Sequence, residues 1–149
     1  MSDQNDIDAI KKLKYRYFRN VDQKNLDAIE QQLLPECSTS YHGGRYGNPD
    51  RATTMAFLRA ALGKHLLTMH QAHHPDIELL GNDEARGYWY MHDIVINLQE
   101  NTRLEGNGFF EDRYRKVNGE WKFLHTGYHR TFALTQPLGE VVNLYNAFS

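Results

Sequence analysis

Residues 108–123 read GFFEDRYRKVNGEWKF, and this stretch decides the fold class. Aromatic and β-branched residues stand on both sides of Asn118-Gly119, the dipeptide most typical of a two-residue turn between antiparallel strands. The pattern therefore predicts a hairpin with strands over residues 104–117 and 120–132.

A second hairpin precedes this one. Strand-like runs over 68–80 and 84–98 are separated by Gly81-Asn82-Asp83, which also favours a tight turn. The second half of the chain is thus expected to form an antiparallel meander of four strands. The tail, residues 137–148, is expected to be either a short closing helix or an irregular arm.

The first part of the chain has helical periodicity. Apolar residues recur at helical spacing over residues 4–19, and lysines and arginines between them predict a solvated face. Further elements are expected as follows: a helix from Leu26 ended by Pro35, a strand over 37–42, a loop over 43–49, and a helix from Asp50 or Thr53 to Gly63.

Length and composition suit one soluble globular domain over residues 1–149. The chain has 149 residues, 40% of them hydrophobic and 24% charged, which is too short for two ordinary domains. Helices followed by a meander predict an α+β fold, with the helices packed on one face of a strongly curved antiparallel sheet. Such a sheet and its helices enclose a cone, which either side chains or a ligand must fill.

Several classes of protein are disfavoured. The net charge is −2 with no block of like charge, which argues against a nucleic-acid partner. No apolar run approaches the ~20 residues that cross a bilayer, and residues 1–20 do not resemble a signal peptide. Cys37 is the only cysteine, so neither a disulfide nor a cysteine-based zinc site is expected, and the thiol is expected to be inert. The expected location is cytoplasmic.

A metal site is not expected either. The run His70-Gln71-Ala72-His73-His74 contains three imidazoles, but strand alternation puts His70 and His73 on opposite faces.

Four stretches of this chain resemble the SnoaL-like branch of the NTF2-like superfamily, whose members are cone-shaped α+β domains (cystatin-like rolls). The resemblance covers roughly residues 5–132. The stretches are YRYFRNVD (15–22), TMHQAHHPDIE (68–78), ARGYWYMHD (85–93), and GFFEDRY (108–114) followed by NGEWKF (118–123). The resemblance implies the fold described above.

A set of polar residues carries a narrower resemblance. Tyr17, Asp22, Tyr41, His70 and Asp93 match by residue type the site of bile-acid 7α-dehydratase-like proteins. The Asp22/His70 pair also resembles the dyad of scytalone dehydratase and hexachlorocyclohexane dehydrochlorinase. These relatives are cofactor-free lyases that abstract a proton and expel water or chloride, so the resemblance implies a site that needs no cofactor.

Each of these residues then has a candidate role. His70 is the base, and Asp22 orients its imidazole and stabilises the imidazolium. Tyr17 and Tyr41 donate to the oxyanion or the leaving hydroxyl. The alternatives remain a packed or surface histidine, a turn aspartate, and core tyrosines with satisfied hydroxyls.

Asp93 shares one strand face with Trp89 and Met91. An acid among large apolar side chains is costly unless it is bonded, which favours a functional pocket, where Asp93 would position a group or return the proton. The alternative is that this face is solvated. Candidate substrate contacts are Trp89, Phe110 and Phe57. Whether His73, His125, His129 or Arg130 line the cone stays open, because a β-bulge reverses strand parity.

The favoured function is a cofactor-independent lyase of dehydratase type, acting on a hydrophobic, carbonyl-bearing small molecule. The alternatives are an isomerase with the same proton abstraction, a non-catalytic binding or accessory domain, and an assembly domain with a filled cone. A homo-oligomer, dimer or trimer, is expected because Tyr88 and Tyr90 would otherwise expose an aromatic patch.

Overall fold

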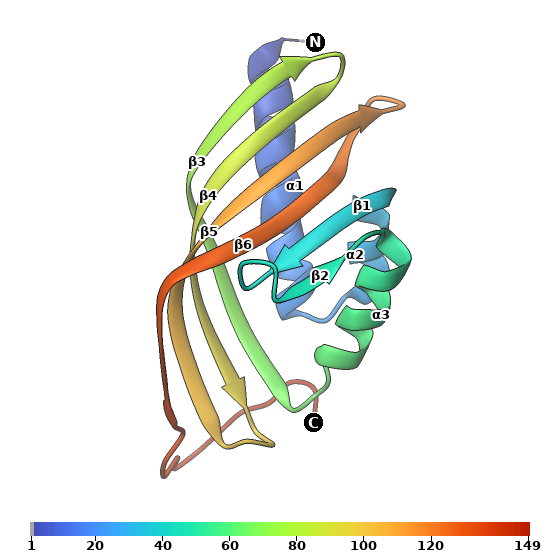
Figure 1. Ribbon diagram of the computed structural model, residues 1–149. Coiled ribbons are helices and arrows are strands. Elements are labelled where there is room, and N and C mark those ends of the chain that lie inside the picture. The colour runs from blue at the N-terminus through green and yellow to red at the C-terminus, as the bar shows by residue number, and fades with distance from the viewer. Residues whose placement is uncertain (1) are drawn as a thin grey trace.

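The long strands of the second half form a strongly curved sheet, and three helices lie on its concave side (Figure 1). The computed structural model describes residues 2–149. The helices are α1 (Asp3–Asp22), α2 (Leu26–Gln32) and α3 (Arg51–Ala61). The strands are β1 (Leu33–Tyr41), β2 (Tyr46–Asn48), β3 (Leu66–Gly81), β4 (Glu84–Asn97), β5 (Thr102–Val117) and β6 (Glu120–Pro137).

The sheet has six strands in the order β2-β1-β6-β5-β4-β3. The four-stranded meander β3–β6 is antiparallel throughout, as the turn signals predict. The sheet as a whole is mixed, because β1 pairs parallel to β6, with Ser38 opposite His125. The fold class is confirmed. The parallel pairing was not predicted, because it joins strands that no hairpin connects.

Local sequence explains the turns and caps. Asn118 and Gly119 both have positive φ, 51° and 80°, as the primed turns of hairpins require. Asp50 caps α3 in a reciprocal capping box with Thr53.

Two assignments differ from the prediction, and a third alternative is decided. Helix α2 ends at Gln32, and Pro35 lies inside β1, where the pairing with β6 is irregular between Leu33 and Ser38 and a missing N–H costs no regular ladder bond. Tyr46–Asn48 forms the short edge strand β2 instead of a loop. Beyond Pro137 the tail has no helix, so it is the irregular arm.

Irregular pairing bends the sheet around the helices. Register shifts lie between Asn107 and Gly108 and between Arg113 and Tyr114 where β5 pairs with β6, and bulges of this kind bend a strand and increase its twist. At Gly127 of β6 a β-carbon would lie 2.6 Å from the backbone carbonyl oxygen of Ser40 on β1, so the close approach of these strands requires glycine. The bent sheet forms the wall of a cone.

One residue of α1 contradicts the predicted solvated face. Lys14 is fully buried, and its Nζ lies 2.9 Å from Oδ2 of Asp112 and 3.5 Å from the ring centroid of Phe110. Burial lowers the pKa of Lys14 to about 8. Lys14 follows the buried Ile10 by four residues, so it faces the sheet with the apolar stripe of the helix.

Within residues 2–149, none of the helices combines the length and apolar character that a membrane crossing requires.

Candidate active site

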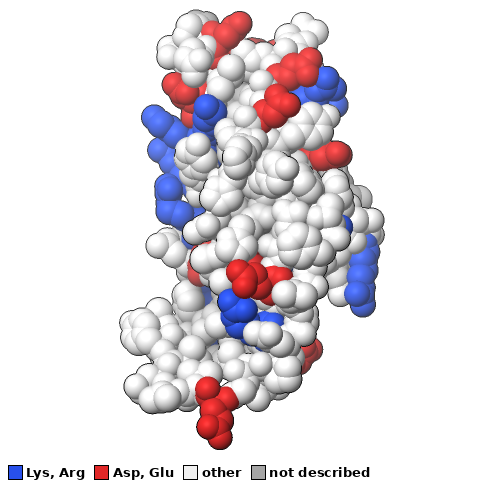
Figure 2. Space-filling model, turned by 90° about the vertical axis from the view of Figure 1, so that its left-hand side faces the viewer, with Lys and Arg blue, Asp and Glu red and all other residues white. Residues whose placement is uncertain are grey.

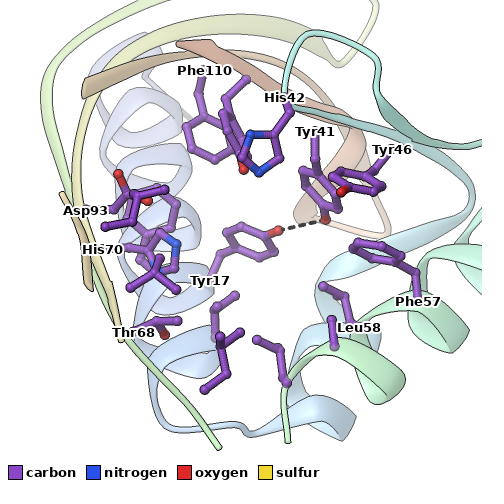
Figure 3. Close-up of a pocket in the computed structure, with 18 of the residues that line it drawn as sticks. Tyr17, Tyr41, His42, Tyr46, Phe57, Leu58, Thr68, His70, Asp93 and Phe110 are labelled. Carbon is purple, nitrogen blue, oxygen red and sulfur yellow. Dashed lines mark hydrogen bonds between the residues drawn. The ribbon is translucent and has the colours of Figure 1, made fainter. Parts of the chain in front are cut away.

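A cavity of about 240 Å³ lies between the concave face of the sheet and helices α1 and α3 (Figure 3). Its walls are mostly apolar and aromatic, and Phe57 and Phe110, two of the predicted substrate contacts, line it. The polar side chains on its walls are those of Tyr17, Tyr41, His42, Tyr46, Thr68, His70, Asp93, Tyr128 and Arg130. A hollow lined by apolar and aromatic side chains, with polar groups that converge on it, is typical of a small-molecule site.

The structure brings His70 and Asp22 together. His70 lies on β3 and Asp22 is the last residue of α1, and His70 Nδ1 is 2.6 Å from Asp22 Oδ1. His70 lines the cavity, whereas Asp22 lies behind it. A carboxylate at this position accepts the Nδ1–H, which leaves Nε2 of the imidazole as the atom able to accept a proton.

Two further donors fix the carboxylate of Asp22. The backbone N–H of His70 donates to Oδ2 at 2.8 Å, and the hydroxyl of Thr68 donates to Oδ1 at 2.9 Å. An anion at a helix C-terminus is not stabilised by the helix dipole, so these hydrogen bonds offset an unfavourable position. Thr68 was not predicted as a site residue, although strand alternation puts it on the face of His70.

Tyr17 and Tyr41 face each other across the cavity (Figure 3), and their hydroxyl oxygens are 3.2 Å apart. Both side chains are buried. Burial raises the pKa of Tyr41 to about 12 and that of Tyr17 well above its usual value. Both phenols therefore stay protonated at neutral pH and can donate hydrogen bonds.

Asp93 is buried at the cavity wall and is held by Arg130. The guanidinium donates from Nη1 to Oδ1 at 2.8 Å and from Nη2 to Oδ2 at 2.6 Å. Burial alone would lower the pKa of Arg130, but the paired carboxylate raises it. The strand face of Asp93 is thus interior, as predicted, and its negative charge is neutralised by Arg130.

The predicted contact Trp89 is not part of the cavity wall. Its side chain is 1% exposed, and its Nε1 donates to the hydroxyl of Tyr114 at 3.0 Å. Trp89 lies on the inner face of β4, as predicted, but in the part of the sheet that packs against α1. The expected role in substrate binding is therefore corrected to a role in the core.

The bulges settle which residues of β6 face the cavity. Arg130 lines it, whereas His129 stacks on Phe109 at a centroid distance of 5.8 Å, and neither His129 nor His125 lines the cavity. His125 Nδ1 lies 2.7 Å from the hydroxyl of Ser38. His73 does not line the cavity either.

Over the described range, residues 2–149, no group of three or more His, Cys, Asp or Glu side chains is arranged to hold a metal ion. Cys37 is buried, and burial raises the pKa of its thiol to about 12.

A family model places the chain among known proteins. The SnoaL-like domain model matches residues 2–127.

Similar solved structures agree on the fold. A provisionally assigned scytalone dehydratase from Novosphingobium aromaticivorans is 21% identical, with a TM-score of 0.82 over 95% of this chain and 99% of that one. A hexachlorocyclohexane dehydrochlorinase from Novosphingobium barchaimii is 12% identical, with a TM-score of 0.80 over 95% and 96% of the two chains. A provisionally assigned aromatic ring hydroxylase from Novosphingobium aromaticivorans is 15% identical, with a TM-score of 0.81 over 92% and 96%. Because the activities in these names differ, the likeness shows the shared fold and not a shared reaction.

Proposed function

Because the chain belongs to the SnoaL-like family, we propose that it is an enzyme of the cofactor-independent lyase type. In this proposal His70 removes a proton next to a carbonyl group of a hydrophobic small molecule. The single observation that carries the proposal is the contact of 2.6 Å between His70 Nδ1 and Asp22 Oδ1 at the wall of an apolar cavity.

The proton transfer follows from this geometry. Nε2 of His70 accepts the proton, and the carboxylate of Asp22 stabilises the imidazolium that forms. Because Thr68 and the backbone N–H of His70 hold Asp22 in place, the imidazole is oriented before the substrate enters.

The developing negative charge needs donors on the opposite side of the substrate. Tyr17 or Tyr41 donates to the carbonyl oxygen, which becomes an enolate oxygen as the proton leaves. In a second step the electrons of the enolate form a carbon–carbon double bond, and the β-hydroxyl group takes up a proton and leaves as water.

The ion pair of Asp93 and Arg130 points to the charge of the substrate. The guanidinium is already neutralised by two hydrogen bonds to Asp93, so it offers no free positive charge to a carboxylate or phosphate. Its Nε is buried without a partner among the residues described and can donate to a neutral oxygen. We therefore propose an uncharged substrate that carries a ketone and a β-hydroxyl group.

The test uses 4-hydroxy-4-phenylbutan-2-one, an uncharged β-hydroxy ketone, and follows formation of the conjugated enone by its ultraviolet absorbance. We expect turnover by the wild type and a fall in kcat of ~10²-fold or more in His70→Ala. The melting temperature should change little, because His70 is at the cavity surface. His74→Ala, a change of the same kind on β3 outside the cavity, is the control.

Other outcomes separate the alternatives. A product with a displaced double bond and no loss of water would indicate an isomerase. A ketone that binds in the cavity, without exchange of its α-hydrogens for deuterium from the solvent, would support a non-catalytic binding domain.

A further inference from the structure

His42 faces the cavity from a position where strand geometry would turn it away. It follows Tyr41, the last residue of β1, whose side chain points inward. Successive residues of a strand point to opposite faces, yet Tyr41 and His42 line the same cavity. Figure 3 shows the ring of His42 directed toward the space above Tyr17.

A left-handed backbone conformation causes this change of direction. The φ of His42 is 54°, which is unfavourable for a residue with a β-carbon. Gly43 and Gly44 follow with φ of 65° and 96°, at no steric cost. An unfavourable backbone conformation that directs a side chain into a cavity is typical of functional positions.

Neighbouring rings hold the imidazole in place. It packs edge to face against Tyr128, with a centroid distance of 5.1 Å, and against Tyr46, at 5.6 Å. The backbone N–H of Gly43 donates to the carbonyl of Tyr128 at 2.9 Å and so anchors the turn to β6. Within the described chain neither ring nitrogen of His42 has a hydrogen-bond partner, so both are free for a bound molecule.

The charges around His42 favour release of a proton from its imidazolium form. Burial lowers its pKa below the usual value, and the nearby Arg130 and Arg45 lower it further, while Asp93 opposes them. Nδ1 of His70 faces the carboxylate of Asp22, whereas, among the residues that the structure describes, neither ring nitrogen of His42 faces a carboxylate within hydrogen-bond distance. The two imidazoles of the cavity are thus suited to opposite tasks: one gains a proton and the other gives one away.

We propose that His42 is a second catalytic residue, which donates a proton to the oxygen that leaves the substrate. This inference rests on the proposed function. His70 takes the proton from the α-carbon, and the electrons of the enolate that results then form the carbon–carbon double bond. The bond from the β-carbon to oxygen breaks, and the oxygen keeps its electrons, takes the proton of His42 and departs as water. The proton on His70 then returns through solvent to His42, and both residues regain their starting states.

The test compares two substrates that differ in how much help the leaving group needs. One is 4-hydroxy-4-phenylbutan-2-one, whose hydroxyl must be protonated to leave. The other is 4-(4-nitrophenoxy)butan-2-one, whose nitrophenolate leaves without a proton. His42→Phe keeps a ring between Tyr46 and Tyr128 but removes the proton donor.

We expect His42→Phe to lower kcat for the hydroxy ketone by ~10²-fold or more and to leave kcat for the nitrophenoxy ketone within a few-fold of wild type. His74→Phe is the matched control. His74 is also a histidine with a left-handed backbone, φ 51°, and it packs edge to face on Tyr90 outside the cavity. That variant should leave both rates unchanged.

Different results would overturn the proposed function and the proposed role of His42. If the wild type eliminates neither leaving group, the proposed function is wrong. If the wild type is active and His42→Phe either lowers both rates equally or lowers neither, the role of His42 is overturned while the proposed function stands. Melting temperatures of all variants exclude loss of folding as the cause.

Discussion

At the scale of single residues, the carboxylate of Asp22 has the most demanding position in the site. It stands at the end of α1 and accepts hydrogen bonds from His70 Nδ1, the backbone N–H of His70 and the hydroxyl of Thr68. An amide of the same shape can accept through one oxygen only, and its NH₂ group would face donors. The site therefore needs two acceptor oxygens and the negative charge that they share, which an amide of the same shape lacks.

We predict that Asp22→Asn lowers kcat for the β-hydroxy ketone by ~10²–10⁴-fold, because the imidazolium of His70 loses its counter-charge. The measurement is steady-state kinetics together with a melting curve. Thr68→Val, which removes one donor and keeps the charge, should have a much smaller effect. Equal losses in the two variants would contradict the role of the charge.

The sequence predicts part of this site well. Alternation along β3 and β4 places His70 and Asp93 inward, and the resemblance to known dyads pairs His70 with Asp22. It could not predict the partner of Asp93, because the bulge between Asn107 and Gly108 decides which residues of β6 face inward. It also missed His42, since strand alternation from Tyr41 points it outward and only the left-handed φ reverses that direction.

At the scale of elements, one buried ion pair joins α1 to β5. Lys14 contacts Asp112, which also accepts hydrogen bonds from Tyr114 at 2.8 Å and Thr126 at 2.6 Å. Removing one partner of such a pair leaves a buried charge uncompensated.

Lys14→Met should therefore destabilise the protein by about 3–5 kcal/mol, whereas Lys14→Met with Asp112→Asn should recover much of this loss. The free energy of unfolding in urea is the measurement. If the double variant is as unstable as the single one, the cost arises from packing around the helix and not from the unpaired carboxylate.

The pH dependence of stability gives a second readout of the same pair. The pKa of Lys14 is about 8 in the folded state, below its ordinary 10.5, so between these values the unfolded chain binds more protons. The contribution of Lys14 to stability therefore rises as the pH increases from about 8 to 10.5. That rise should be absent in Lys14→Met.

The elements themselves were predictable to different degrees. Both hairpins follow from turn chemistry within a few residues, and the turn at Asn118-Gly119 has the φ values that its residues favour. The burial of Lys14 was missed because a lysine counts as polar in a periodic pattern even when it falls on the apolar stripe. The pairing of β1 with β6 has no local signal.

At the scale of the whole molecule, the outer face of the sheet carries a row of aromatic rings. Rings from four strands follow one another across it: His74, Tyr90, Phe109 and His129, with centroid distances of 4.5 to 5.8 Å. Figure 2 shows uncharged side chains over the upper middle of this face, with a cluster of acidic and basic side chains below them. Tyr90 is 48% exposed and Phe132 on β6 is 62% exposed.

We propose that this face binds a second copy of the chain. Strands of 14 to 18 residues, at ~3.3 Å per residue and ~4.8 Å between strands, give a face large enough for the ~800 Å² that each partner of a stable interface buries. Charged groups on this face form ion pairs with one another, as Arg86 does with Glu78 and Arg103 with Glu105, which reduces charge repulsion between two copies.

Light scattering after size exclusion should therefore give a mass of two or three chains for the wild type. Tyr90→Lys and Phe132→Glu should each reduce that mass to one chain, because they add charge in the apolar area. Val117→Lys, at the tip of the β5–β6 hairpin, is the control and should leave the mass unchanged. A monomeric wild type at high concentration would overturn the proposal.

The parallel pairing of β1 with β6 has a consequence for biosynthesis. Ser38 meets His125, so the walls that carry Tyr41 and Arg130 come together only after β6 has been synthesised. Strand pairs between residues far apart in the sequence form slowly. We therefore expect the cavity that defines the site to form late as the protein folds.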